Sequence, residues 1–295
     1  MLTNTFCHIP GIGEKTERNL WAAGVTSWHS VLPQSGLRLP TSIREAWLGL
    51  MEESRGNHIN RNPSYFTERL PLKEHWRLYR DFQDSCAFVD IETTGLFSAE
   101  ITTIVLYDGR TIRHYVKGEN LDAFIADLAA YRLLVTYNGK SFDVPFIEGH
   151  FHVRLSQAHI DLRWPLWCLG LKGGLKGCEQ QLGISRPGME GIDGFIAPLL
   201  WYKYRNDGNL KALETLLAYN IQDALSLHTL MVHAYNVKVR ATPFSDTHSL
   251  PSPSLPESPF KADPEIVEGV CYRPVVPVHG LVESPPDGQI GNVVR

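Results

Sequence analysis

An apolar run that ends in two acids constrains the fold of this chain more than any other feature. In the segment AFVDIETTGLF, residues 87–97, Asp90 and Glu92 stand one residue apart at the end of a strand-like stretch. Residues i and i+2 of a strand point to the same face, so the two carboxylates would lie side by side. Such a pair is costly unless protonation, basic side chains or a divalent metal compensates. Arg110 is the only basic residue among residues 86–111, which favours a metal, because Mg²⁺ prefers carboxylate oxygens.

Strand-like and helical segments alternate through the middle of the chain. The apolar pattern predicts strands at residues 86–92, 100–108, 110–118, 132–138 and 158–162. Asp108-Gly109 is a hairpin turn signal between the second and third of these. Helical spacing covers residues 120–131, with Asn120 as N-cap, and residues 208–236, with Asn209 as N-cap. This order predicts an α/β fold around a mixed sheet, although helix–strand alternation alone fits several α/β folds.

Two further acids stand where a metal site would need them. Asp143 follows an apolar strand and an Asn-Gly turn in LLVTYNGKSFDVPF, residues 133–146. Asp223 lies inside the long predicted helix among apolar neighbours, and Tyr219 precedes it by one helical turn on the same face. A phenol beside a metal-bound acid can orient an attacking water. The expected metal ligands are therefore Asp90, Glu92, Asp143 and Asp223.

Three motifs carry a resemblance to a known family. DIETTGL, YNGKSFDVPF and YNIQD, in this order, resemble the motifs of the DnaQ-like 3′–5′ exonucleases in their tyrosine-bearing (DEDDy) branch. The spacing of the motifs is also similar to that of the bacterial YprB-type ribonuclease H-like proteins. This resemblance covers about residues 86–232 and implies a ribonuclease H-like mixed five-stranded sheet flanked by helices. The histidine-bearing branch fits less well, because Ala218 stands where that branch has its histidine.

The resemblance also implies a reaction and a set of residue roles. The reaction is hydrolysis of DNA or RNA phosphodiester bonds from the 3′ end with two divalent ions, Mg²⁺ or Mn²⁺. Asp90 would bridge both ions, Glu92 and Asp223 would hold the ion that activates water, and Asp143 would support the second ion. Tyr219 would position the nucleophile. Contacts to the terminal nucleotide would come from Thr94, Leu96, Asn138 and Phe142.

The N-terminus contains a second motif. HIPGIGEKTERNLWAAGVTSW, residues 8–28, resembles a helix-hairpin-helix, whose glycine loop holds a nucleic-acid backbone without recognising its sequence. Gly11 and Gly13 permit a tight turn with exposed amides in front of a helix at residues 14–23, and such amides bind phosphate. Lys15 adds a positive charge. Only about eight residues precede the loop, so the first helix would be short, and a protein contact or a simple turn is the alternative use.

The charge balance gives a weaker indication of the partner. Residues 1–240 contain 25 basic and 25 acidic residues, so global charge makes no case for nucleic acid. Residues 163–211 are locally basic, with seven Lys or Arg against four Asp or Glu. An ordinary solvated face is an equally good interpretation of this stretch. The candidates for phosphate contacts there are Lys172, Lys176, Lys203 and Arg205.

Composition divides the chain into three predicted parts. Residues 1–82 form a helical module that contains the helix-hairpin-helix and has helical spacing at residues 14–23, 41–53 and 72–82. Residues 83–238 form the ribonuclease H-like domain. Residues 239–295 form an acidic tail with ten of the nineteen prolines, which predicts disorder and leaves the tail available to a protein partner.

Several classes of protein are excluded by the sequence. Apolar stretches are too short for a membrane span, and the N-terminus lacks the pattern of a secretory signal. Five scattered cysteines form no C-x-x-C pair, so we expect a reducing, cytoplasmic location and no membrane partner. The favoured function is a metal-dependent 3′–5′ exonuclease. Its rivals are an endoribonuclease or structure-specific nuclease on the same site, and a non-catalytic nucleic-acid-binding protein.

Overall fold

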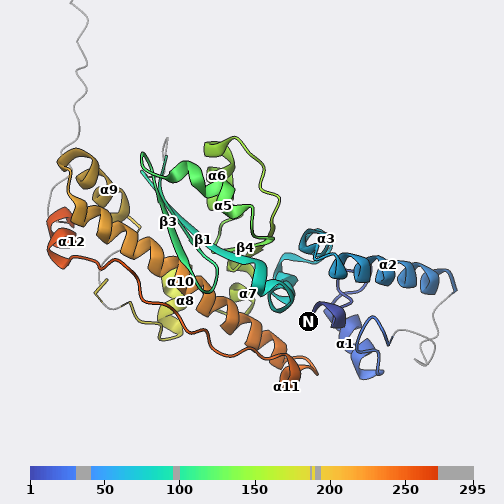
Figure 1. Ribbon diagram of the computed structural model, residues 1–295. Helices are drawn as coiled ribbons and strands as arrows, with labels where there is room; N and C mark the ends of the chain where they lie inside the picture. Colours follow the sequence, from blue (N-terminus) through green and yellow to red (C-terminus); the bar gives the residue numbers. More distant parts are fainter. Residues whose placement is uncertain (31–40, 96–99, 187, 190–193, 272–295) are drawn as a thin grey trace, which may run out of the picture.

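A five-stranded mixed sheet lies at the centre of the protein (Figure 1). The computed structural model describes residues 1–30, 41–95, 100–186, 188–189 and 194–271. The strand order is β3-β2-β1-β4-β5; β2 pairs antiparallel with β1 and β3, whereas β4 pairs parallel with β1 and β5. The strands are β1 (Cys86–Thr93), β2 (Ile101–Tyr107), β3 (Ile112–Val116), β4 (Leu133–Thr136) and β5 (Ala158–Asp161). The predicted mixed five-stranded sheet is confirmed.

The alternation of β1 separates its acids from its apolar side chains. Val89 and Ile91 are buried in the apolar core on one face of the sheet, and Asp90 and Glu92 are half-buried on the other. Pairing with β2 places Glu92 opposite Thr103, and the register shifts directly after Glu92. Such an irregularity bends a strand locally. The two carboxylates therefore lie where the regular part of β1 ends.

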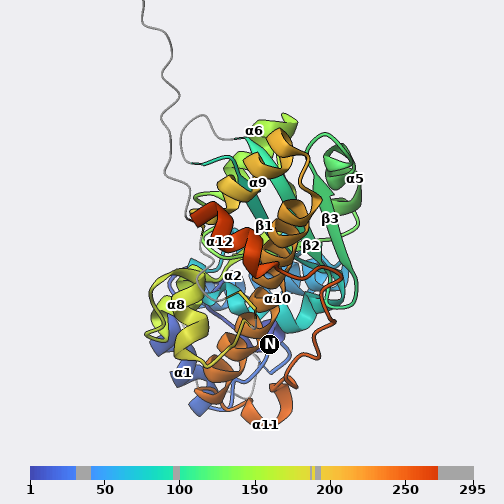
Figure 2. The same cartoon turned by 90° about the vertical axis from the view of Figure 1, so that its left-hand side faces the viewer.

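Helices cover both faces of the sheet. α10 (Leu210–Arg240) runs along the face that bears the acids, and α5 (Phe124–Leu128) and α6 (Asp143–Phe151) lie on the other face (Figures 1 and 2). A 3-10 turn, η4 (Leu121–Ala123), leads into α5. The predicted cap of α10 is confirmed, because the side chain of Asn209 accepts a hydrogen bond from the backbone N–H of Ala212.

Asn120 stands at the predicted N-cap position, before η4, but its side chain does not cap the turn. Its side-chain oxygen accepts from the backbone N–H of Val116 at 2.7 Å, and its amide donates to the carbonyl oxygen of His114 at 3.0 Å. Asn120 thus closes the end of β3 and makes no cap hydrogen bond to the helical turn that follows. Between β5 and α10 the described elements are α7 (Arg163–Cys168), α8 (Gly174–Gln181) and α9 (Ile196–Asp207).

The N-terminal third consists of short helical elements that share a core with the sheet. Phe6 and Trp28 belong to the same apolar cluster as Phe88 of β1 and Tyr235 of α10. The described elements are η1 (Leu2–Asn4), α1 (Glu14–Ala22), α2 (Thr41–Ile59), α3 (Pro63–Thr67), η2 (Leu72–Leu78), α4 (Tyr79–Phe82) and η3 (Gln83–Ser85). Chain segments far apart in sequence therefore form one continuous core under the α10 face of the sheet.

The continuous α-helix predicted for residues 72–82 is wrong over its first part. The segment η2 is a 3-10 helix, and only α4 is α-helical. All five residues from Glu74 to Leu78 are buried. The prediction assumed an amphipathic helix with one buried stripe and one exposed face, whereas this segment is buried on all sides.

The prediction of disorder from residue 239 needs correction. α10 extends through Arg240, and the described residues that follow lie along α10 in the opposite direction, through α11 (Ser245–His248) to α12 (Pro264–Cys271) (Figure 1). Asn236 of α10 exchanges two hydrogen bonds of 2.8 Å with the backbone of Leu250. Apolar side chains such as Phe260 pack on the core. Proline prevents regular hydrogen bonding but does not prevent docking of apolar side chains; residues 272–295 lie outside the described part of the chain.

The helices give no indication of a membrane span. Within the described ranges, none is both long enough and apolar enough to cross a bilayer.

Candidate active site

Three of the four predicted metal ligands converge between β1 and α10. Carboxylate oxygens of Asp90, Glu92 and Asp223 lie within 4.8 Å of one another. The strand supplies two of them on one face, and the helix that crosses this face supplies the third. Because three acids share a small volume, each raises the free energy of charging its neighbours. The arrangement has the oxygen-rich chemistry that a hard divalent cation prefers.

Asp90 is held by a side chain of α10 that the sequence argument missed. The amide of Asn220 donates to Oδ2 of Asp90 at 2.7 Å, and the Asn220 oxygen accepts from the hydroxyl of Thr103 at 3.0 Å. Asn220 is fully buried. Its position three residues before Asp223 on one helix is a spacing that could have identified it. Burial, then the negative charges of Asp223 and the other acids, hold the pKa of Asp90 well above its usual range.

Asp223 has a basic partner that sequence reasoning also missed. The guanidinium of Arg186 forms an ion pair with Oδ1 of Asp223. Arg186 also donates from Nε and Nη2 to the two oxygens of Glu179 on α8, at 2.6 and 2.7 Å. Burial raises the pKa of Asp223, and Arg186 opposes this effect. The local excess of basic residues between 163 and 211 was the available signal, but it did not single out Arg186.

Asp143 lies beside these three acids, outside the group whose oxygens meet. It is buried at the first turn of α6. Burial and then Asp223 raise the pKa of both Asp90 and Glu92, and the charge of Asp143 adds to both shifts, which places it in the same electrostatic environment. Burial raises the pKa of Asp143 itself to about 7. The structure thus brings together Asp90, Glu92 and Asp223 and places Asp143 next to them.

The turn before α6 is fixed by a buried acid from β5. Oδ1 of Asp161 accepts from the backbone N–H of Asn138 at 2.7 Å, and Oδ2 accepts from that of Lys140 at 3.2 Å. Asn138 has a positive φ of 61°, which asparagine tolerates. Its side-chain oxygen accepts from Arg163 at 2.7 Å. Strand β5 therefore determines where the turn presents Asp143 to β1.

The residues expected to contact the nucleotide lie on two loops. Thr94 follows β1, and its hydroxyl accepts from the backbone N–H of Glu100. Phe142 is the residue before α6, and its ring lies 4.7 Å from that of Phe146. Leu96 lies outside the described residues. The roles of Thr94, Asn138 and Phe142 in substrate binding stay predictions.

Tyr219 lies on α10 one turn before Asp223. It is 4% exposed, with Nζ of Lys176 at 4.6 Å from its ring centre and the Arg186 guanidinium at 5.7 Å. Burial and the charge of Asp223 raise the pKa of the Tyr219 hydroxyl, so it stays protonated at neutral pH. The hydroxyl is therefore available as a hydrogen-bond donor or acceptor beside the acids.

The donor set fits a divalent metal ion. Three carboxylates offer oxygens at mutually close range, and in the described part of the chain Oδ1 of Asp223 is contacted by the Arg186 guanidinium. Without a cation, burial and mutual repulsion favour protonated acids. With one, all three can be charged at neutral pH.

A comparison with models of known protein families identifies the family of this chain. A family model described as the RNase H superfamily matches residues 87–235, about half of the chain. The chain belongs to the RNase H superfamily. The matched segment contains β1 from Ala87 on, β2 to β5, α10 as far as Tyr235, and the four acids.

The chain is also similar to a curated protein. This relative is the uncharacterized protein YprB of Bacillus subtilis (strain 168), which is 30% identical over 170 residues. The alignment covers 50% of this chain and 41% of YprB, so the chain spans less than half the length of this relative. No solved structure gives a significant match.

The glycine loop lies outside the matched RNase H domain, at the start of α1. Gly11 has a φ of 83°, and Gly13 is the residue before the helix. Both glycines and Lys15 are exposed, and neither glycine has a neighbouring atom where a Cβ would stand. Before the loop, the described structure contains only the short 3-10 turn η1. The first arm of the predicted hairpin is thus a single turn, and phosphate binding by the loop stays a prediction.

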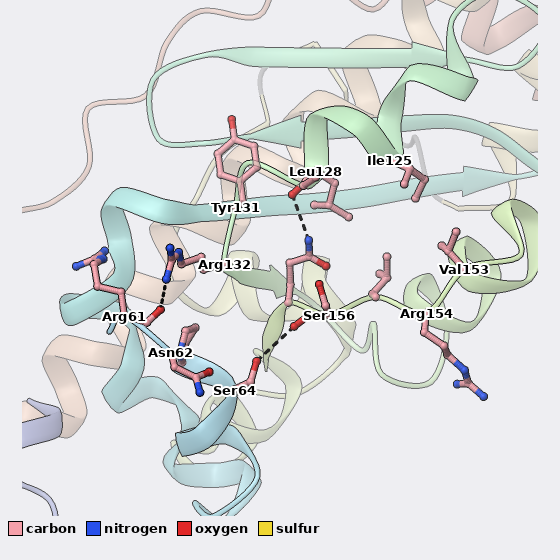
Figure 3. A pocket seen from close by; sticks show the side chains of 14 residues that line it. Arg61, Asn62, Ser64, Ile125, Leu128, Tyr131, Arg132, Val153, Arg154 and Ser156 are labelled. Atoms are coloured by element: carbon pink, nitrogen blue, oxygen red, sulfur yellow. Dashed lines mark hydrogen bonds between the residues drawn. The ribbon is translucent and has the colours of Figure 1, made fainter. Parts of the chain in front are cut away.

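A cavity of about 510 Å³ lies between the N-terminal elements and the sheet (Figure 3). It sits where β4 and β5 begin, whereas the acids lie toward the end of β1 and after the end of β4. Arg132 bridges this edge to the N-terminal elements by donating to the carbonyl oxygens of Asn60 and Arg61 at 3.2 and 2.6 Å. The cavity is therefore a feature of the junction between the N-terminal elements and the sheet, separate from the carboxylate cluster.

Proposed function

We propose that the protein is a metal-dependent nuclease that removes nucleotides from the 3′ end of DNA or RNA. The observation that carries this proposal is the convergence of Asp90, Glu92 and Asp223 with Asp143 beside them, in a chain of the RNase H superfamily. Nucleases of this superfamily use divalent metals. We propose Mg²⁺ or Mn²⁺ as the metal, because oxygen-only ligand sets suit these cations. We also propose that two such ions bind.

The chain's own residues divide into holding and orienting groups. Asp90, Glu92 and Asp223 would hold the metal, with support from Asp143. When bound, divalent ions would lower the pKa of a water molecule and stabilise charge on the leaving oxygen. Asn220 fixes one oxygen of Asp90 through a 2.7 Å hydrogen bond. This hydrogen bond restricts the orientation of the Asp90 carboxylate beside Glu92 and Asp223.

Tyr219 supports the assignment of an exonuclease with a tyrosine-bearing site. Its raised pKa keeps the hydroxyl protonated, so it can orient the attacking water by a hydrogen bond but does not act as the base that deprotonates it. The loop with Thr94 and the turn with Asn138 and Phe142 flank the acids along the chain. We propose that these two loops hold the terminal nucleotide.

The N-terminal glycine loop would anchor the rest of the strand. Exposed amides at the start of α1 and the positive charge of Lys15 suit a phosphate group without requiring base contacts. This interpretation of the loop as a helix-hairpin-helix is part of the proposal, as is a cytoplasmic location.

A labelled-oligonucleotide assay tests the proposed activity. Single- and double-stranded DNA and RNA with a 5′ label are incubated with Mg²⁺ or Mn²⁺, and we expect a ladder that shortens from the 3′ end. Asp223→Ala should lower the rate by more than about 100-fold, because changes outside the metal-ligand shell alone cost 10–100-fold. Asp207→Ala, which removes an exposed acid at the end of α9, is the matched control and should keep the wild-type rate.

A blocked 3′ end separates the exonuclease from its rivals. An exonuclease stalls on a blocked 3′ end, whereas a structure-specific or RNA-directed endonuclease on the same acids still cuts internally. Absence of hydrolysis on every substrate with either metal, together with retained nucleic-acid binding, would establish the non-catalytic alternative.

A further inference from the structure

Arg186 has two carboxylate partners, which it binds in different ways. Its contacts with Glu179 are two aligned hydrogen bonds of 2.6 and 2.7 Å. Its contact with Oδ1 of Asp223 is an ion pair that lacks the alignment of a hydrogen bond. The side chain is 11% exposed. Glu179 therefore holds the guanidinium through two aligned hydrogen bonds, and Asp223 holds it mainly through charge.

The Asp223 oxygen that Arg186 approaches belongs to the carboxylate group that also faces Asp90 and Glu92. A divalent ion coordinates carboxylate oxygens at about 2.0–2.6 Å. An ion among these acids would stand within a few ångströms of the guanidinium, and two cations at that distance repel strongly in a partly buried site. Nη1 of Arg186 has no hydrogen-bond partner in the described part of the chain, so the hydrogen bonds of the guanidinium do not hold all three of its nitrogens.

We propose that Arg186 is an internal counter-cation that occupies Asp223 in the metal-free protein and must yield it when a divalent ion binds. Glu179 is its tether: it retains the guanidinium beside the site after Asp223 has been released. Arg186 thus lowers the cost of three clustered acids without metal and, for the same reason, weakens metal binding. This inference rests on the proposed use of a divalent metal by Asp90, Glu92 and Asp223.

Two variants should move metal affinity in opposite directions. Arg186→Gln removes the competitor, and we expect Ca²⁺ and Mn²⁺ to bind about tenfold more tightly. Glu179→Gln leaves the guanidinium with Asp223 as its main partner and removes a negative charge, so the same ions should bind several-fold more weakly. If Arg186 and Glu179 only anchored α8, both substitutions would loosen the same contact and shift affinity in the same direction.

The experiment is calorimetric titration of the full chain with CaCl₂ or MnCl₂ in the absence of nucleic acid. Thermal unfolding with and without metal accompanies each titration. Metal-free Arg186→Gln should melt below the wild type, and saturating metal should stabilise it more than it stabilises the wild type. Arg154→Gln, which removes an exposed arginine paired with Glu148, is the control and should bind metal as the wild type does.

The outcomes separate this inference from the proposed function. If the wild type binds metal and hydrolyses nucleic acid, but folded Arg186→Gln binds metal equally or more weakly, the counter-cation role is wrong. If Arg186→Gln fails to fold, Arg186→Lys and Glu179→Gln replace it. Arg186→Lys retains the positive charge and should bind metal with wild-type affinity. Glu179→Gln should bind metal more weakly, and an unchanged affinity contradicts the role of Glu179 as a tether. A wild type that binds no divalent ion at all overturns the proposed function itself.

Discussion

Asn220 connects the strand that carries the acids to the helix that completes the site. It donates to Asp90 of β1, accepts from Thr103 of β2 and is fully buried on α10. A buried amide with both ends satisfied has few alternative orientations. Asn220 therefore restricts the orientation of the Asp90 carboxylate beside the other acids.

We expect Asn220→Ala to lower hydrolysis by about 10–100-fold, the usual effect of removing a group that orients a metal ligand. It should also lower the free energy of unfolding by about 1–3 kcal/mol, because a buried carboxylate oxygen and a buried hydroxyl lose their partners. Steady-state rates and urea unfolding measure the two effects. Thr103→Val, which leaves the hydrogen bond to Asp90 in place, is the control and should affect the rate less; equal rates for all three proteins would refute the orienting role.

The raised pKa values of the acids predict an unusual pH dependence of stability. Burial raises the pKa of folded Asp143 to about 7, above the unfolded value of about 3.9. Between these values the folded state binds more protons than the unfolded state, so the free energy of unfolding falls as pH rises from about 4 to about 7. The raised pKa values of Asp90 and Glu92 add to the same trend.

We therefore expect metal-free protein in EDTA to be less stable at about pH 8 than at about pH 5 in urea unfolding. Asp143→Asn should reduce this difference, because the amide does not titrate. Excess Mn²⁺ should remove or reverse it, because the ion stabilises the charged carboxylates. A metal-free protein whose stability rises over this interval, with Asp143→Asn behaving identically, would show that these acids are not perturbed as described.

At the scale of elements, the turn between β4 and α6 determines where Asp143 is presented. Gly139 lies so close to Thr136 that a Cβ there would stand 2.0 Å from its Oγ1. The same Oγ1 accepts a hydrogen bond from the Gly139 backbone N–H at 3.1 Å. The turn is thus packed directly onto the last residue of β4, and only glycine fits at this position.

Gly139→Ala should lower the free energy of unfolding by about 1–3 kcal/mol through overpacking. It should also lower hydrolysis, because the start of α6 has to move. Gly149→Ala in α6 is the matched control, since a Cβ at that position would meet no neighbouring atom within 4 Å, and alanine there should be neutral or stabilising by up to about 1 kcal/mol. Urea unfolding of both variants provides the measurement, and equal effects of the two substitutions would contradict the packing argument.

The amino-acid sequence predicted the elements that are specified by patterns within short segments. The alternation around Asp90, the Asp108-Gly109 hairpin and the apolar periodicity of α10 are properties of short segments, and the sheet and long helix follow from them. Asn120 and η2 differ from prediction because strand closure and burial on several sides are tertiary effects. The partners of the acids are also tertiary: Arg186 and Asp223 are 37 residues apart, and no local pattern joins them.

At the scale of the whole molecule, a buried ion network joins α1 and the residues before the glycine loop to η2, which shares a core with the sheet. Arg77, only 3% exposed, pairs with Glu74 at 2.7 Å and with Glu17 of α1 at 2.8 Å. Glu17 also accepts from the hydroxyl of Thr5 at 2.6 Å and from the backbone N–H of Phe6 at 2.7 Å. Both sides of the glycine loop are therefore tied through Arg77 to the core shared with the sheet.

This anchoring gives the proposed phosphate-binding loop a fixed relation to the acids, and Lys15 tests its use. We expect Lys15→Ala to weaken binding of a single-stranded oligonucleotide several-fold at low salt. The slope of log affinity against log salt concentration should also fall by about one, because one phosphate contact is lost. Binding of Ca²⁺ should stay at the wild-type value, since Lys15 lies on α1 and not among the carboxylates.

The control for this prediction is Arg154→Ala, which removes an exposed cation of the same charge shortly after α6, a helix that lies well away from α1 (Figure 1). Fluorescence anisotropy at several salt concentrations gives both affinity and slope. If the loop is only a turn, Lys15→Ala and Arg154→Ala should give the same small change. If instead the loop binds the nucleic-acid backbone, only Lys15→Ala changes the slope. The loss of affinity should then be larger for oligonucleotides long enough to reach from the acids to α1.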